Sequence, residues 1–226
     1  MIADLHAHIL PGADSACPDL RTAQRHLKRA ARAGVTHIAA ASEYDPTTTL
    51  PEDFLRRRDE AFAALAGIPE AQPLTLSPCA EVIWCPGLEK LSALESLTLG
   101  TGNLLVRVQP GESALAVAES AAALQTRLHG EILLTNADAL PAEEAQLLFS
   151  AGARCILPLA SLADRERRAS LLPWVQAGFV LGIGSTGGER VLPYRGLRRV
   201  SRKIGRDFDA LMRAAAEAAW PEETIS

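Results

Sequence analysis

The sequence predicts a single α/β domain in which parallel strands alternate with helices in a barrel-like arrangement. Short apolar, often β-branched runs alternate with longer segments of helical periodicity along the whole chain. Gly and Pro residues stand at many of the junctions between these segments, where helices end and loops begin. An open, doubly wound sheet is the alternative arrangement of the same elements.

The first three elements define the repeating unit. A strand is expected over 2–9, and a helix follows over 18–34, where Gly34 supplies the stop signal. The next apolar run, 35–41, predicts a second strand. A strand, a helix and a strand in this order form a βαβ unit with two buried parallel strands.

The same alternation continues to the end of the chain. It predicts helices over 51–66, 88–97, 114–128, 141–151, 164–177 and 207–220. It predicts further strands over 74–82, 104–108, 131–135, 153–159 and 178–183. Seven strand-then-helix units with short loops and no linker indicate one domain over 1–226.

Composition and charge narrow the functional classes. The 226 residues carry a net charge of −4, so the overall charge does not indicate binding to nucleic acid or to an anionic membrane. No apolar run is long enough to span a bilayer, and no secretory signal is recognisable. The basic run 195–206 indicates a solvated helix face, with a docking surface for an acidic or phosphorylated partner as the alternative. Four scattered cysteines without a CxxC pair predict reduced thiols and a cytoplasmic protein.

The clearest chemical signal lies in the first fourteen residues. His6 and His8 are two apart on the first predicted strand, so we expect them to share one face with Asp4. Imidazole nitrogens at this spacing can bind one metal ion together with an oxygen ligand from elsewhere. The segment 10–12 (LPG) ends the strand, and Asp14 follows it. Two histidines that are simply satisfied polar groups inside a barrel are the alternative interpretation.

Residues 4–14 (DLHAHILPGAD) resemble the opening motif of the PHP (polymerase and histidinol phosphatase) superfamily. They are most similar to the branch of bacterial manganese-dependent protein-tyrosine phosphatases found with capsule and exopolysaccharide genes. Ser15 and Ala16 stand where that branch has a second Asp and a Gly. The resemblance implies a distorted (β/α)7 barrel, and the seven predicted strands agree with this fold.

A second segment extends the resemblance. Glu81, in the segment 79–83 (CAEVI), matches a family Gly-Ala-Glu-Ile segment whose Glu bridges metal ions. Two histidines and a glutamate suit manganese, zinc or iron, with manganese implied by the family. Glu43, where the family has a His after Ser42, is a further candidate ligand. A surface or salt-bridged carboxylate is the alternative interpretation of Glu81.

Other positions depart from the family pattern. Arg107 stands where an acidic ligand is expected, and Asn136 stands in place of a His. The residues after the seventh strand, 185–188 (STGG), replace a Ser-Asp-x-His motif. The surviving ligands predict one divalent ion or none, whereas the family uses two or three.

The resemblance and the residue types together give a functional hypothesis. The chain is expected to be a metal-dependent phosphoesterase of the protein-tyrosine-phosphatase type, linked to capsule or exopolysaccharide biosynthesis. Its partner would be a phosphotyrosine-bearing protein such as the tail of a bacterial tyrosine kinase. Asp14 would protonate the leaving phenolate, and Arg107 or Arg190 would hold the phosphoryl oxygens. A solvated loop charge is the alternative interpretation of Arg190.

Two other classes stay open. The missing ligands favour a catalytically inactive PHP pseudoenzyme that regulates a polysaccharide-export tyrosine kinase. A different, amidohydrolase-like hydrolase also opens with His-x-His, but such enzymes generally need a late Asp and further His ligands that are missing from this sequence.

Overall fold

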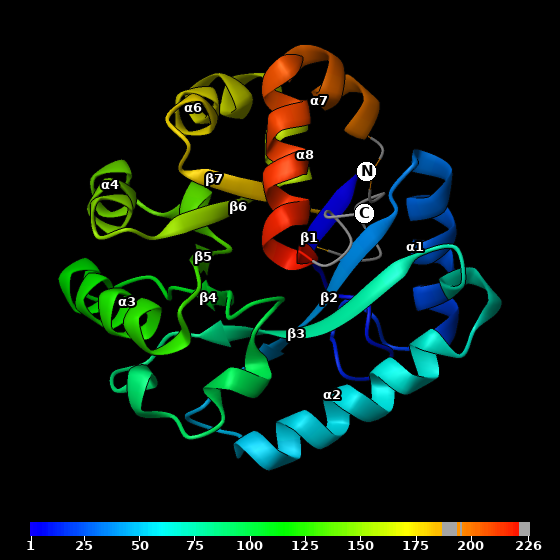
Figure 1. Cartoon of the computed structure of the whole chain (residues 1–226), viewed down its shortest axis with the longest axis horizontal. Coiled ribbons are helices and arrows are strands. Elements are labelled where there is room, and N and C mark those ends of the chain that lie inside the picture. The colour runs from blue at the N-terminus through cyan, green and yellow to red at the C-terminus, as the bar shows by residue number, and fades with distance from the viewer. Residues whose placement is uncertain (187–193, 195, 222–226) are drawn as a thin grey trace.

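The computed structural model describes residues 1–186, 194 and 196–221. This part of the chain forms seven parallel strands that follow one another in sequence order around the sheet. The strands are β1 (Ala3–Ala7), β2 (His37–Tyr44), β3 (Thr75–Ile83), β4 (Leu104–Arg107), β5 (Ile132–Leu134), β6 (Arg154–Pro158) and β7 (Val180–Gly184). They surround a common centre in Figure 1.

Helices connect the strands on the outside of this barrel (Figure 1). The α-helices are α1 (Leu20–Ala33), α2 (Pro51–Ala66), α3 (Ala114–Leu128), α4 (Ala142–Ser150), α5 (Leu159–Ala163), α6 (Arg165–Gln176), α7 (Leu197–Ile204) and α8 (Arg206–Ala219). Four short 3-10 helices are η1 (Pro69–Ala71), η2 (Leu88–Lys90), η3 (Leu94–Leu97) and η4 (Ala137–Ala139). None of the helices in the described ranges has the length and apolar character that crossing a membrane requires.

The sequence-based elements are confirmed, with differences of a few residues at their ends. Gly34 caps α1 in the left-handed conformation with φ 87°, as the stop signal predicted. The helix predicted over 88–97 is wrong, because extended backbone at Leu91 separates η2 from η3. Buried Leu88 and Leu94 hold these two short turns in the core, so packing replaces a continuous helix.

The strand order settles the choice between a barrel and an open sheet. A doubly wound sheet requires a reversal of strand order, whereas these strands run consecutively from β1 to β7. β7 then lies against β1, and the Thr186 backbone N–H donates to the His6 carbonyl over 2.9 Å. The predicted distorted (β/α)7 barrel is therefore confirmed as a nearly closed barrel, and the open sheet is wrong.

Glycine makes this closure possible. A Cβ atom added to Gly184 would lie 2.7 Å from the His6 Cβ and 2.9 Å from the His6 carbonyl oxygen. A Cβ at Gly182 would lie 2.4 Å from a Leu5 methyl group. The seam between β7 and β1 is thus too close for a side chain at Gly184, and a side chain at Gly182 would require Leu5 to shift.

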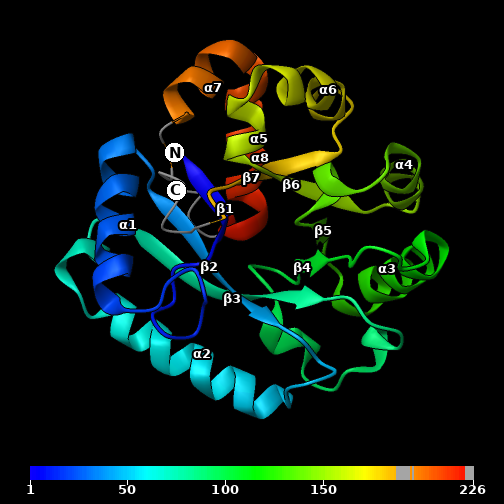
Figure 2. The same ribbon diagram turned by 180° about the vertical axis from the view of Figure 1, so that it is seen from behind.

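One end of the barrel is filled by α8. The interior holds a small apolar core to which every strand and α8 contribute. The Trp220 indole N–H donates to the Ser77 hydroxyl over 2.8 Å, near the start of β3. The Asn103 amide, just before β4, donates to the Ala218 carbonyl over 2.8 Å. α8 lies in front of the strands in Figure 1 and behind them in Figure 2, so the carboxyl ends of the strands lie at the opposite end, where functional residues of such barrels gather.

We expect Gly184→Ala to lower the free energy of unfolding by about 1–3 kcal/mol, because the methyl group forces β7 away from His6. Urea unfolding followed by circular dichroism measures this change. Gly67→Ala is the matched control, since a Cβ there makes only ordinary contacts at 3.4 Å or more. Equal stabilities of the two variants would contradict the tight seam.

Candidate metal centre

An irregularity in β1 determines which of its side chains enter the barrel. Asp4 pairs with Ile38 and Ala7 pairs with Ala40, so β1 has one residue more than β2 between these two pairs. The extra residue interrupts the alternation of faces, because Leu5 belongs to the inner core whereas Ala7 belongs to the outer one. Bulges of this kind commonly re-aim side chains next to functional sites.

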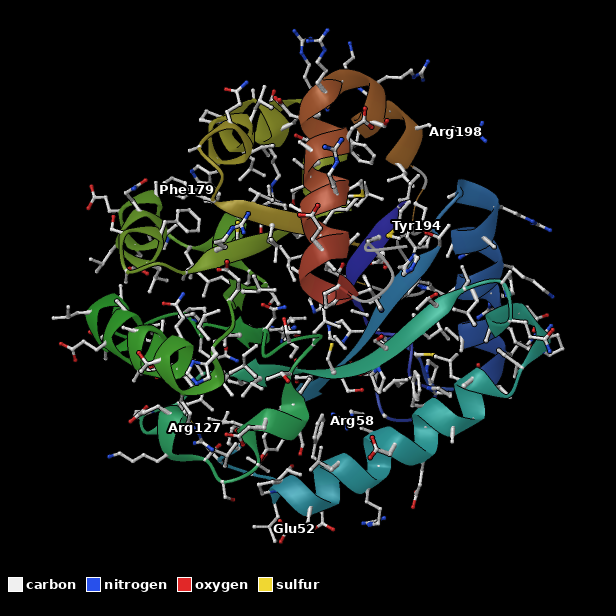
Figure 3. The ribbon with its side chains drawn as sticks, viewed as in Figure 1. Glu52, Arg58, Arg127, Phe179, Tyr194 and Arg198 are labelled. Atoms are coloured by element: carbon white, nitrogen blue, oxygen red, sulfur yellow. The ribbon has the colours of Figure 1, made fainter. Side chains whose placement is uncertain are left out.

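The prediction that Asp4 shares a face with His6 and His8 is wrong for this reason. The Asp4 carboxylate is buried, and its Oδ2 accepts a hydrogen bond of 2.6 Å from the Tyr194 hydroxyl. Its Oδ1 accepts the backbone N–H groups of Ser185 at 3.0 Å and His6 at 3.1 Å. Burial raises the pKa of Asp4, although these hydrogen bonds oppose the change. Asp4 therefore ties β1 to the end of β7 and to Tyr194, which Figure 3 labels.

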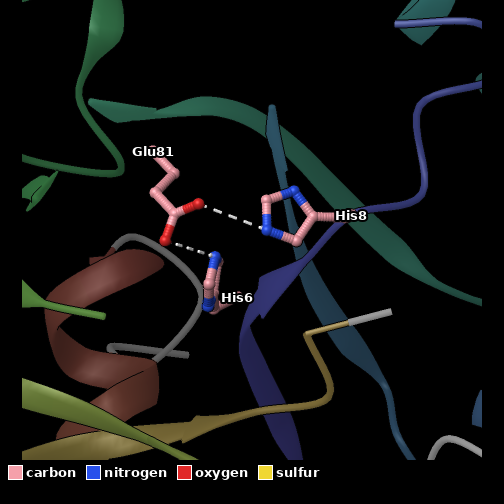
Figure 4. Close-up of side chains that lie close together, drawn as sticks. All are labelled: His6, His8 and Glu81. Carbon is pink, nitrogen blue, oxygen red and sulfur yellow. Dashed lines mark ion pairs between the residues drawn. The ribbon is translucent and has the colours of Figure 1, made fainter. Parts of the chain in front are cut away.

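The two histidines instead converge on Glu81 of β3 (Figure 4). His6 Nε2 lies 3.3 Å from Glu81 Oε1, and His8 Nε2 lies 3.3 Å from Glu81 Oε2. One ligand atom from each of the three residues falls within 4.8 Å of the others. All three are nearly inaccessible to solvent, with Glu81 only 1% exposed. The structure thus brings together the three residues that the sequence predicted as principal ligands.

Asp14 lies behind His8. Asp14 Oδ1 is 3.6 Å from His8 Nδ1, and Asp14 Oδ2 accepts the Leu10 backbone N–H over 2.9 Å. A carboxylate on the far nitrogen fixes the orientation of an imidazole and leaves its other nitrogen to face a metal ion. Burial would lower the pKa of His8, but Asp14 and Glu81 raise it to about 9. The contacts of Asp14 are therefore those of an orienting residue.

Two side chains, one at the end of β4 and one just after β5, hold Glu81 in place. The Thr135 hydroxyl, just after β5, donates to Glu81 Oε1. Arg107, at the end of β4, places Nη2 at 2.9 Å from Glu81 Oε2 and Nε at 3.3 Å from Oε1. Burial opposes ionisation of Glu81, but His6 and His8 hold its pKa well below the usual range. The sequence analysis missed Thr135, although its place directly after the apolar run 132–134 was a usable signal.

Glu43 remains outside the ligand group. It is the cross-strand partner of Glu81 in the pairing of β2 with β3, but its side chain is 49% exposed. Its carboxylate forms an ion pair with Nη1 of Arg107. Arg107 therefore joins Glu43 to Glu81, and the structure does not place Glu43 among the converging ligands.

Of the remaining candidate positions, Asn136 does not reach this group. The Asn136 amide makes two hydrogen bonds to the Val108 backbone, at 3.2 Å from its N–H and 2.7 Å to its carbonyl, and so joins the loops after β4 and β5. Arg190 lies outside the described residues, as do Gly187 and Gly188. Their predicted roles stay predictions.

The chemistry of the donor set fits one divalent metal ion. Within the described residues, buried His6 Nδ1 makes no hydrogen bond, and the contacts of buried His6 Nε2 and Glu81 Oε2 are the ion pairs described above. Buried polar atoms without hydrogen-bond partners are uncommon unless they serve a ligand or an ion. Two imidazole nitrogens and one carboxylate oxygen suit zinc, manganese or iron.

Comparison with known proteins identifies the fold. No family model matches the sequence, and no curated protein matches it. A solved structure covers 96% of this chain and 94% of its own with a TM-score of 0.79 and 18% sequence identity. It comes from work on YwqE from Bacillus subtilis and CpsB from Streptococcus pneumoniae, described as unique metal-dependent tyrosine phosphatases. The predicted resemblance to such phosphatases is confirmed at the level of the fold.

The paired His8 side chain predicts a pH-dependent stability in chelator-treated protein. A histidine whose folded pKa is raised from 6.5 to about 9 stabilises the protein fully below pH 6.5, and this contribution disappears as the pH rises through 9. The unfolding free energy of wild type relative to His8→Gln should fall by about 3 kcal/mol across this window. Urea titrations at several pH values measure the difference, and a difference that grows with pH would contradict the ion pairs.

Proposed function

We propose that the protein is a metal-dependent phosphoesterase that hydrolyses phosphotyrosine in a protein substrate. The observation that carries this proposal is the convergence of His6, His8 and Glu81 at the open end of the barrel, within 4.8 Å of one another. A divalent ion bound there would supply Lewis-acid activation of water and neutralise charge on the phosphoryl group. The shared barrel with metal-dependent tyrosine phosphatases supports the same reaction class.

The surrounding residues have distinct roles in this proposal. His8 is oriented by Asp14, and Glu81 is oriented by Thr135. The role of leaving-group acid fits Asp14 poorly, because its carboxylate is buried against His8 and the Leu10 amide. Arg107 is 32% exposed at the rim, so its guanidinium can hold phosphoryl oxygens by two hydrogen bonds.

The depth of the site favours an aryl phosphate. His6 and Glu81 are 3% and 1% exposed, so a phosphoryl group has to be carried into the barrel on a long, narrow side chain. Phosphotyrosine satisfies this requirement better than phosphoserine, whose phosphate lies close to the peptide backbone. A cytoplasmic tyrosine-kinase tail linked to capsule or exopolysaccharide biosynthesis is the proposed substrate, with manganese as the proposed ion.

Metal analysis and activity test the proposal together. Protein purified without chelator should contain about one divalent ion per chain and hydrolyse a phosphotyrosyl peptide faster than a phosphoseryl peptide. The double variant His6→Ala/His8→Ala should lose the ion and at least about 100-fold in rate, because two of three ligands are gone.

A histidine far from the site provides the control. His129 is exposed and has a positive φ of 55°, which asparagine tolerates, so His129→Asn should keep both metal and activity. Hydrolysis that survives in the double variant would rule out this centre as the source of activity.

One observation favours a second function. The Arg107 guanidinium supplies a positive charge to Glu81 from the chain itself, as a protein that has lost catalysis would require. On this proposal the protein binds phosphotyrosyl peptides and regulates the kinase that carries them. Folded, metal-free protein that binds the phosphotyrosyl peptide without hydrolysing it would support the regulator over the enzyme.

A further inference from the structure

We infer that Arg107 is a resident cation that competes with the divalent ion for Glu81, and that Glu43 retains Arg107 at the rim when the ion binds. This inference rests on the proposed metal centre but not on its catalytic activity. It assigns Arg107 and Glu43 to the control of metal affinity.

The first observation is a pair of neighbouring carboxylates. Glu43 of β2 and Glu81 of β3 are paired across two parallel strands, and side chains at paired positions point to the same face. Like charges in this arrangement repel each other. Arg107 follows Leu105, the β4 partner of Glu81, by two positions, so its side chain is directed to the same face. The three neighbouring strands therefore place the Arg107 guanidinium between the carboxylates of Glu43 and Glu81.

The second observation is where the guanidinium lies on Glu81. Arg107 contacts both oxygens, with Nη2 at 2.9 Å from Oε2 and Nε at 3.3 Å from Oε1. His6 and His8 approach the same two oxygens at 3.3 Å each. An ion bound by both histidines and Glu81 would therefore lie within a few ångströms of the guanidinium. Two cations at that distance in a buried site repel strongly, so binding of the ion and full contact of Arg107 with Glu81 oppose each other.

The third observation is a gradient of exposure along the three side chains. Glu81 is 1% exposed, Arg107 is 32% exposed and Glu43 is 49% exposed. Arg107 can consequently leave Glu81 by moving outward while its Nη1 stays paired with Glu43. The buried carboxylate is then free for the ion, and the guanidinium remains near the mouth of the barrel.

This arrangement gives Glu43 and Arg107 opposite effects on the ion. Arg107 weakens metal binding because it has to be displaced from Glu81. Glu43 strengthens metal binding, through Arg107, because it stabilises the displaced position. Glu43 as a direct ligand would also strengthen binding, but independently of Arg107, so a double-mutant cycle separates the two explanations.

The experiment is calorimetric titration of chelator-stripped protein with Mn²⁺ in the absence of substrate. We expect Arg107→Gln to bind Mn²⁺ at least about tenfold more tightly than wild type, because the competing charge is gone. Arg107→Lys keeps the charge and should stay within about threefold of wild type. Arg56→Gln removes an equal charge from an exposed ion pair on α2 and should leave the affinity unchanged. Unchanged or weaker binding by Arg107→Gln would overturn the inference.

The Glu43 variants complete the cycle. Glu43→Gln should weaken Mn²⁺ binding by at least about threefold in wild type and have no effect in the Arg107→Gln background. An equal loss in both backgrounds would make Glu43 a metal ligand and overturn its role as the retaining group. Since no substrate is present, a protein that binds Mn²⁺ in this pattern but does not hydrolyse phosphotyrosine would refute the proposed function and leave this inference standing.

Discussion

The buried carboxylate of Glu81 is the constraint on which the rest of this site depends. It is 1% exposed, and an ionised carboxylate without partners in such a place would be strongly destabilising. Four side chains contact this carboxylate and compensate its charge by ion pairs or a hydrogen bond. They are His6, His8, Arg107 and Thr135, which lie in or just after β1, β4 and β5. The open end of the barrel is therefore organised around one anion, whether the compensating cations belong to the protein or are bound from solution.

The barrel fold makes this convergence possible through two local departures from regular geometry. The bulge in β1 breaks the alternation of faces, so Asp4 binds the end of β7 while His6 and His8 reach Glu81. The glycines of β7 then let that strand approach β1 closely enough for Thr186 to bond the His6 carbonyl. The backbone of His6 is fixed from both sides, by Asp4 and by the strand that closes the barrel.

Periodicity in the sequence was sufficient for the elements but not for the site in detail. Strands and helices depend on local patterns of apolar residues, and these predicted α2 and α3 to the residue. The face of Asp4 was predicted wrongly because a bulge is set by pairing with a neighbouring strand, which strict alternation cannot reveal. Thr135 and the contacts of Arg107 were missed because they depend on which side chains the closed barrel brings together. The convergence of His6, His8 and Glu81 was predictable because residue type and resemblance both pointed to these three residues.

The same contacts compensate the charge of Glu81 with groups of the chain itself. Without an ion, Arg107 and a protonated His8 neutralise the charge around Glu81, so the carboxylate is compensated by the chain itself. Binding of an ion to this cluster would have to remove the proton from His8, because imidazole coordinates metals only when neutral, and would place a second positive charge close to the Arg107 guanidinium, which repels it. Both effects would subtract from the metal affinity that His6, His8 and Glu81 would otherwise provide. The proposed metal centre and a purely salt-bridged core therefore use the same residues, and the position of one proton and one arginine side chain would decide between them.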